Sequence, residues 1–180
     1  MGERPLAVTN IVRSFYTIFT IPSYALGSVA STLVSNTIGA GKRGEVLHLI
    51  KRIAFISLGV MVCVVTVVSS FPRTMIHIYT DDPGLIKDTV LPLYVLISSL
   101  PIYSVGTVLF NSVSGTGNTR TALAFELFTL AFYIAYMWFI IIYLRSSVAM
   151  AWTTEHVYWI FLLTLSFVYL RSGKWKDRQI

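Results

Sequence analysis

Long runs without charged residues constrain this chain more than any other feature of its sequence. Residues 53–72 and 89–119 contain no charged side chain, and residues 5–41 contain only Arg13. A transmembrane helix needs about 20 mostly apolar residues to cross a hydrocarbon core about 30 Å thick. Strands of a membrane barrel are about half as long and alternate apolar with polar side chains. The runs therefore predict an all-α membrane helix bundle.

Five such segments fit into the 180 residues. Charged residues make up 12% of the chain, about half the share of a typical soluble domain, which excludes an ordinary soluble or disordered protein. The second helix is expected to continue past Pro72 until a turn at 81–84. Within one transmembrane unit of residues 1–180, we predict helices at about 8–38, 53–79, 88–114, 121–144 and 148–170.

Several classes of function lack their sequence signals. The net charge of +6 forms no basic stripe, and no nucleic-acid-binding motif occurs. Cys63 is the only cysteine, so the chain holds neither an internal disulfide nor a cysteine pair for a metal. The segment GTGNT at 115–119 lacks the phosphate-loop pattern and follows a membrane helix. We therefore expect no enzyme, no nucleic-acid partner, no bound metal and no organic cofactor.

Lys and Arg in short loops collect on the cytoplasmic side of membrane proteins. One side of the predicted bundle carries four of these residues, namely Arg4, Arg73, Lys87 and Arg145. The other side carries nine, namely Lys42, Arg43, Lys51, Arg52, Arg120, Arg171, Lys174, Lys176 and Arg178. We predict a multi-pass protein of the cytoplasmic membrane with its C-terminus in the cytoplasm. Five crossings then place the N-terminus outside, as expected for a fragment of a larger protein that starts at an extracellular loop.

The first predicted helix carries two rows with a spacing of four residues, which keeps each row on one face. One row holds the small residues Gly27, Ser31, Ser35 and Gly39, and the other holds the polar residues Ser28, Thr32 and Asn36. These rows fit a seam where helices pack closely. They also fit the wall of a water-filled cavity, because an amide facing lipid is costly.

The third predicted helix repeats this pattern. Pro92 and Pro101 interrupt it, and bent helices with polar faces recur in secondary transporters. Proline is also commoner in membrane helices generally, so the pattern alone leaves both structure and transport open. The candidate cavity residues on its polar face are Ser99, Tyr103, Thr107 and Asn111.

Three charged side chains lie inside predicted spans. Glu126 and Glu155 lie about 9–10 Å from opposite membrane surfaces, at 1.5 Å per residue, so they are expected not to share one proton. Ionisable residues at this depth usually face an interior cavity, which makes both glutamates candidates for binding a proton or cation. The structural alternative is a neutral glutamic acid that joins two helices. Arg13 lies nearest the outer surface and is a candidate cavity residue. The alternative is that its side chain simply extends to that surface.

Three junctions between helices and loops carry a family resemblance. They read LVSNTIGAG at 33–41, NSVSGTGNT at 111–119 and LRSGKW at 170–175. In this order and spacing they resemble the C-terminal lobe of multidrug and toxic compound extrusion (MATE) transporters, over nearly the whole chain. The resemblance implies two six-helix lobes around a central cavity, with the present helices similar to helices eight to twelve.

The resemblance also implies a function. MATE transporters export cationic and amphipathic compounds in exchange for sodium ions or protons, so the expected partners are such compounds, the lipid bilayer and a missing N-terminal lobe. The first and third helices would line the cavity. Some members carry a cation-site aspartate on the helix similar to the third one here, whereas residues 89–119 contain no acid. A lipid-linked saccharide flippase of the same superfamily and a non-transporting membrane scaffold remain alternatives.

Overall fold

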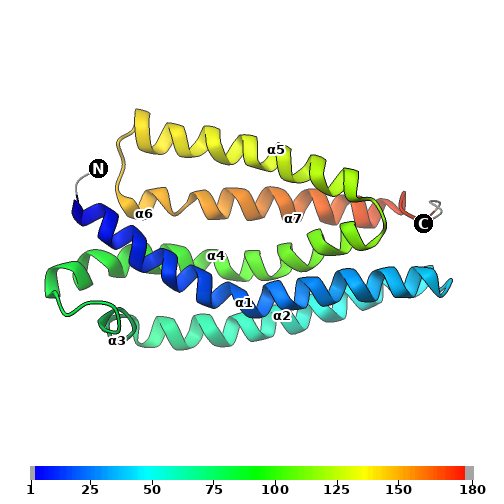
Figure 1. The fold of residues 1–180 in the computed structure, drawn as a ribbon, viewed down its shortest axis with the longest axis horizontal. Helices are drawn as coiled ribbons and strands as arrows, with labels where there is room; N and C mark the ends of the chain where they lie inside the picture. The colour runs from blue at the N-terminus through cyan, green and yellow to red at the C-terminus, as the bar shows by residue number, and fades with distance from the viewer. Residues whose placement is uncertain (1–2, 177–180) are drawn as a thin grey trace.

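The computed structural model describes residues 3–176, which form a bundle of helices with no strand among them (Figure 1). A 3-10 turn, Arg43–Glu45, precedes the second helix, and a π-helical turn, Phe139–Tyr143, continues the fifth. The α-helices are α1 (Glu3–Gly39), α2 (Val46–Ser70), α3 (Pro72–His77), α4 (Pro83–Gly115), α5 (Thr119–Trp138), α6 (Val148–Ala151) and α7 (Thr154–Ser172). The predicted all-α bundle is confirmed.

α4 is the central helix of the bundle. It packs against α1, α2 and α7, and α7 packs in turn against α5. The five long helices run roughly side by side along the length of the molecule (Figure 1). Leu93, Leu96 and Leu100 of α4 are fully buried, as expected for a helix with neighbours on several sides.

Four helical segments of residues 3–176 are long and apolar enough to cross a membrane: α1, α2 with its preceding turn, α4, and α5 with its π-helical turn. α7 is not among them, because Glu155, His156 and Arg171 lower its hydropathy. Its 19 residues still span about 28 Å, close to the thickness of the hydrocarbon core. The predicted fifth span is therefore a long helix beside α4 and α5, but its composition alone does not mark it as a crossing.

Two predicted helices are divided in the structure. The helix predicted at 53–79 begins at Val46 and ends at Ser70, and the stretch after Pro72 forms the separate helix α3. Proline has no N–H to continue the hydrogen-bond ladder, and Phe71 leaves helical geometry with φ −135° and ψ 51°. The segment predicted at 148–170 is likewise split into α6 and α7 around Trp152 and Thr153.

The loops fall at the two ends that the sequence predicts. The start of α1, α3 and α6 lie at one end, and the α1–α2 connection, the α4–α5 connection and the end of α7 lie at the other (Figure 1). Arg178, one of the nine basic residues assigned to the second end, lies outside the described residues. Which end faces the cytoplasm stays a prediction.

Small residues bring α1 and α4 very close together. A Cβ atom built on Gly115 would lie 2.5 Å from the backbone oxygen of Ser31, and one on Gly27 would lie 2.8 Å from Cγ2 of Thr107. The Ser35 hydroxyl donates a hydrogen bond of 2.8 Å to the carbonyl of Gly115. The predicted packing seam is thus confirmed at these positions, while Gly39 has no neighbour within 4 Å of a built Cβ.

Candidate functional site

Glu155 lies between helices that are far apart in the sequence. Its Oε2 accepts a hydrogen bond of 2.8 Å from the hydroxyl of Tyr16 on α1 and one of 3.3 Å from Nε1 of Trp159. The same Trp159 N–H lies 3.2 Å from the Tyr16 oxygen. Glu155 is in the first turn of α7, where the positive end of the helix dipole favours a carboxylate. Trp159 follows four residues later and therefore lies on the same face.

Tyr103 of α4 extends this cluster. Its ring packs edge-on against Trp159 with centroids 4.5 Å apart, and its centroid lies 6.1 Å from that of Tyr16. The Tyr103 hydroxyl donates to the backbone oxygen of Thr20 at 3.3 Å. Aromatic groups thus surround the carboxylate, and side chains from α1, α4 and α7 hold them in place.

A cavity of about 420 Å³ opens beside this carboxylate, between α1, α5 and the start of α7. Arg13 and Glu155 both line it, with Thr9, Tyr133 and Thr154. Neither of the ion pairs found in residues 3–176 joins Arg13 to Glu155. The cavity is therefore lined by a basic and an acidic side chain that form no ion pair with each other.

Glu126 occupies a different environment. Its side chain is exposed on α5, and no hydrogen bond or ion pair joins it to another residue in the described part of the chain. Tyr133 lines the cavity seven residues further along the same helix, which places Glu126 about 10 Å from it along α5. The structure thus does not bring the two glutamates together.

The other candidate cavity residues fall into two groups. Arg13, Ser28, Thr32 and Asn36 are exposed on α1. Those of α4 lie among packed helices: Ser99, Tyr103 and Thr107 are buried, and Asn111 is half-buried and donates to the carbonyl of Thr107 at 2.8 Å. A role of either group in lining a transport cavity stays a prediction.

Two residues of the Glu155 cluster were missed by sequence analysis. Trp159 had a usable signal, since it follows Glu155 by four residues on a helix. Tyr16 had none, because 139 residues separate it from Glu155. His156, the next residue along α7, contacts a different partner: its Nε2 lies 3.0 Å from the hydroxyl of Ser98 on α4.

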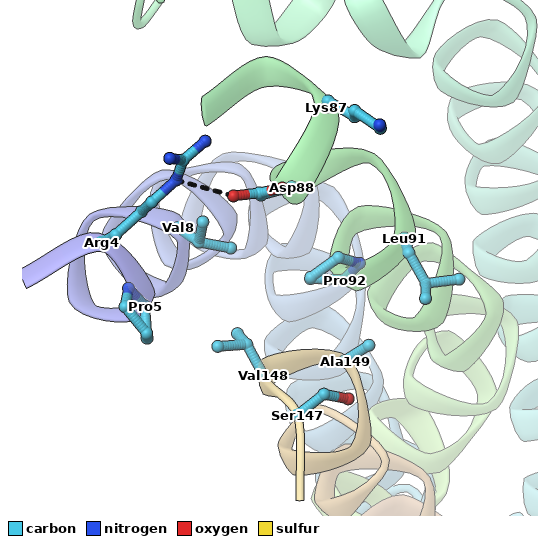
Figure 2. Close-up of a pocket in the computed structure, with 10 residues that line it drawn as sticks. All are labelled: Arg4, Pro5, Val8, Lys87, Asp88, Leu91, Pro92, Ser147, Val148 and Ala149. Carbon is cyan, nitrogen blue, oxygen red and sulfur yellow. Dashed lines mark hydrogen bonds and ion pairs between the residues drawn. The ribbon is translucent and has the colours of Figure 1, made fainter. Parts of the chain in front are cut away.

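A second cavity, of about 490 Å³, lies near the start of α1 (Figure 2). Arg4 and Asp88 form an ion pair of 2.8 Å at its rim, with Lys87 nearby. Both paired side chains are about half exposed, so the pair adds at most about 1 kcal/mol of stability. It joins α1 to the first turns of α4.

No cluster of three or more His, Cys, Asp or Glu side chains suited to a metal occurs in residues 3–176.

Comparison with known proteins decides the family. The MatE family model matches residues 1–139, which is more than half of the chain. The chain belongs to the MatE family. The predicted family resemblance is thereby confirmed, and with the apolar helices it makes this MatE chain a multi-pass membrane protein.

A curated relative agrees with this assignment. The MatE chain is 26% identical over 163 residues to the probable multidrug resistance protein NorM of Thermotoga maritima. The alignment covers 89% of the chain and 35% of the relative, so the chain spans about a third of the relative's length. No solved structure matches the chain. The family match covers α1 to α5, so Glu155 and Trp159 lie beyond it.

Proposed function

We propose that this MatE chain is part of an exporter that moves cationic or amphipathic drugs across the cytoplasmic membrane in exchange for a cation. The observation that carries the proposal is Glu155, a carboxylate held between α1 and α7 at the edge of a 420 Å³ cavity. Charged groups inside membrane bundles are costly and usually serve ion or substrate pathways. Membership of the MatE family and the multidrug resistance relative support the choice of substrate and of a transporter over an enzyme.

We propose a proton as the coupling ion. The groups that contact Glu155 Oε2 are an O–H and an N–H, and both donate hydrogen bonds. Hard metal ions need several oxygen ligands, and the N–H of tryptophan cannot ligate a cation. A carboxylate with donor neighbours suits uptake and release of a proton. Sodium remains the alternative that the transport assay distinguishes.

We propose that the exposed polar row of α1 lines the transport cavity and faces a second helical lobe. Ser28, Thr32 and Asn36 are exposed on a helix that is otherwise apolar enough to cross the membrane. Polar groups avoid lipid, so water or protein must cover this face. The greater length of the NorM relative supports the presence of further helices. We also propose that the end with more basic residues, which includes the C-terminus, is cytoplasmic.

The test of coupling uses Glu155→Gln in the complete transporter that contains this chain. The amide keeps the size of the side chain but cannot release a proton. Efflux of a fluorescent cationic dye from cells is expected to fall to the level of cells without the transporter, with normal membrane abundance. Glu45→Gln, in the exposed turn before α2, is the matched control and is expected to keep full efflux.

Other outcomes lead to different conclusions. Full efflux by Glu155→Gln would remove Glu155 from coupling. Loss of efflux in Glu126→Gln alone would assign coupling to the exposed carboxylate of α5. If the unchanged protein drives no dye movement with either ion, the scaffold or the saccharide flippase replaces the exporter.

A further inference from the structure

A groove far from Glu155 separates α2 from α7. Both helices pack against α4, and between them the structure leaves a cavity of about 360 Å³. Val105 and Leu109 of α4 lie along it. Leu47 of α2 and Phe167 of α7 also line it and are 40% and 48% exposed. The groove is therefore apolar and open on the outer surface of the bundle.

Two cationic side chains also line this groove. Lys51 belongs to α2 and Arg171 to the last turn of α7. Neither takes part in an ion pair within residues 3–176, and no acidic residue lines the groove. Both lie near the end of the bundle that carries most of the basic residues. The groove thus joins an apolar surface to two unneutralised positive charges.

We propose that this groove binds an anionic phospholipid, with an acyl chain along Val105 and Leu109 and the phosphate between Lys51 and Arg171. Charge complementarity selects the occupant: a polybasic surface attracts anionic lipid, and basic pockets between membrane helices bind phosphate headgroups. The chain contacts lipid because it is a membrane protein, so the lipid site does not depend on the proposed transport.

The test measures lipid retention by the full chain in a neutral detergent. The protein is mixed with equal amounts of phosphatidylglycerol and phosphatidylcholine, and bound lipid is counted by native mass spectrometry. We expect phosphatidylglycerol to be retained about thirtyfold more than phosphatidylcholine, the preference that two basic residues near a surface predict. Equal retention of the two lipids would overturn the proposal.

Two double variants separate the groove from general surface charge. Lys51→Gln with Arg171→Gln is expected to abolish the preference. Lys42→Gln with Lys174→Gln removes the same charge at exposed positions outside the groove and is expected to keep it. A similar loss in both double variants would show a diffuse electrostatic effect and contradict a defined site.

A third variant and a competitor test the acyl chain. Ala54 lines the groove and is half-buried, so Ala54→Phe fills the apolar part and leaves both cations in place. This variant is expected to lose lipid retention, and glycerol phosphate is expected not to displace the lipid from the unchanged protein. Retention by Ala54→Phe, or displacement by glycerol phosphate, would show a phosphate site without an acyl-chain groove.

Discussion

Among the glycines of the described residues, Gly115 is the one whose Cβ atom would come closest to a backbone atom. A Cβ atom there would lie 2.5 Å from a backbone oxygen of α1, so Gly115→Ala must push α1 and α4 apart. We expect a loss of about 1–3 kcal/mol in the free energy of unfolding, the usual cost of overpacking. The measurement is denaturant unfolding in detergent micelles.

The matched control for this substitution is Gly59→Ala in α2. Nothing lies within 4 Å of a Cβ built on Gly59, and alanine favours helix over glycine by up to about 1 kcal/mol. Its stability is expected to stay the same or increase. Equal destabilisation by both substitutions would contradict a specific contact between α1 and α4.

Tyr16 tests the hydrogen bonds of Glu155. Tyr16→Phe removes the hydroxyl that donates to Glu155 and accepts from Trp159 but keeps the ring. Because a hydrogen bond to a charged group contributes about 1.5–3 kcal/mol, we expect dye efflux by the complete transporter to fall by about tenfold. Tyr79→Phe is the control. The ring of Tyr79 packs on Phe15, and the substitution is expected to leave efflux unchanged. Normal efflux by Tyr16→Phe would show that this hydrogen bond does not contribute to transport.

At the level of elements, the sequence predicts the long helices but not their breaks. Uncharged runs are visible without any tertiary information, and the ends that they predict for α1, α4 and α5 lie within about six residues of the observed ones. The break after Ser70 is followed by the short helix α3, which packs into the core through its fully buried Ile76. Proline alone does not predict it, since Pro22 lies inside the continuous helix α1.

The contacts of the candidate site are harder to predict from sequence than the helix breaks are. Glu155 stands out in sequence because it is a charge in an apolar segment. Its contact with Tyr16 does not, because the contact depends on how α1 and α7 both pack against α4. Burial also separates rows that look alike in sequence: the row of α1 is exposed, whereas that of α4 is mostly inside the bundle.

The exposed polar row of α1 is expected to face water. In a Cys63→Ser background of the complete transporter, Ser28→Cys and Thr32→Cys are expected to react with a water-soluble maleimide. Val29→Cys and Leu33→Cys are expected to react at least about tenfold more slowly, because an apolar face excludes water. Both pairs are exposed in the described bundle, so equal reactivity would contradict a water-filled cavity on the polar face.

For the whole molecule, the grouping of loops predicts a topology. Gly44 precedes α2 at the basic end, and Asp81 precedes α4 at the opposite end. In intact cells, a membrane-impermeant maleimide is expected to label Asp81→Cys but not Gly44→Cys, again in the Cys63→Ser background. Permeabilised cells are expected to show both labels. The reverse pattern would place the basic end outside.

The proposed exporter couples the movement of a drug to that of a proton. The most direct measurement reconstitutes the complete transporter into liposomes that contain a pH-sensitive dye, and follows proton movement when a cationic drug is added on one side. We predict drug-dependent proton flux without sodium, lost in Glu155→Gln. Drug movement that requires sodium, or that proceeds without any proton flux, would rule out proton coupling.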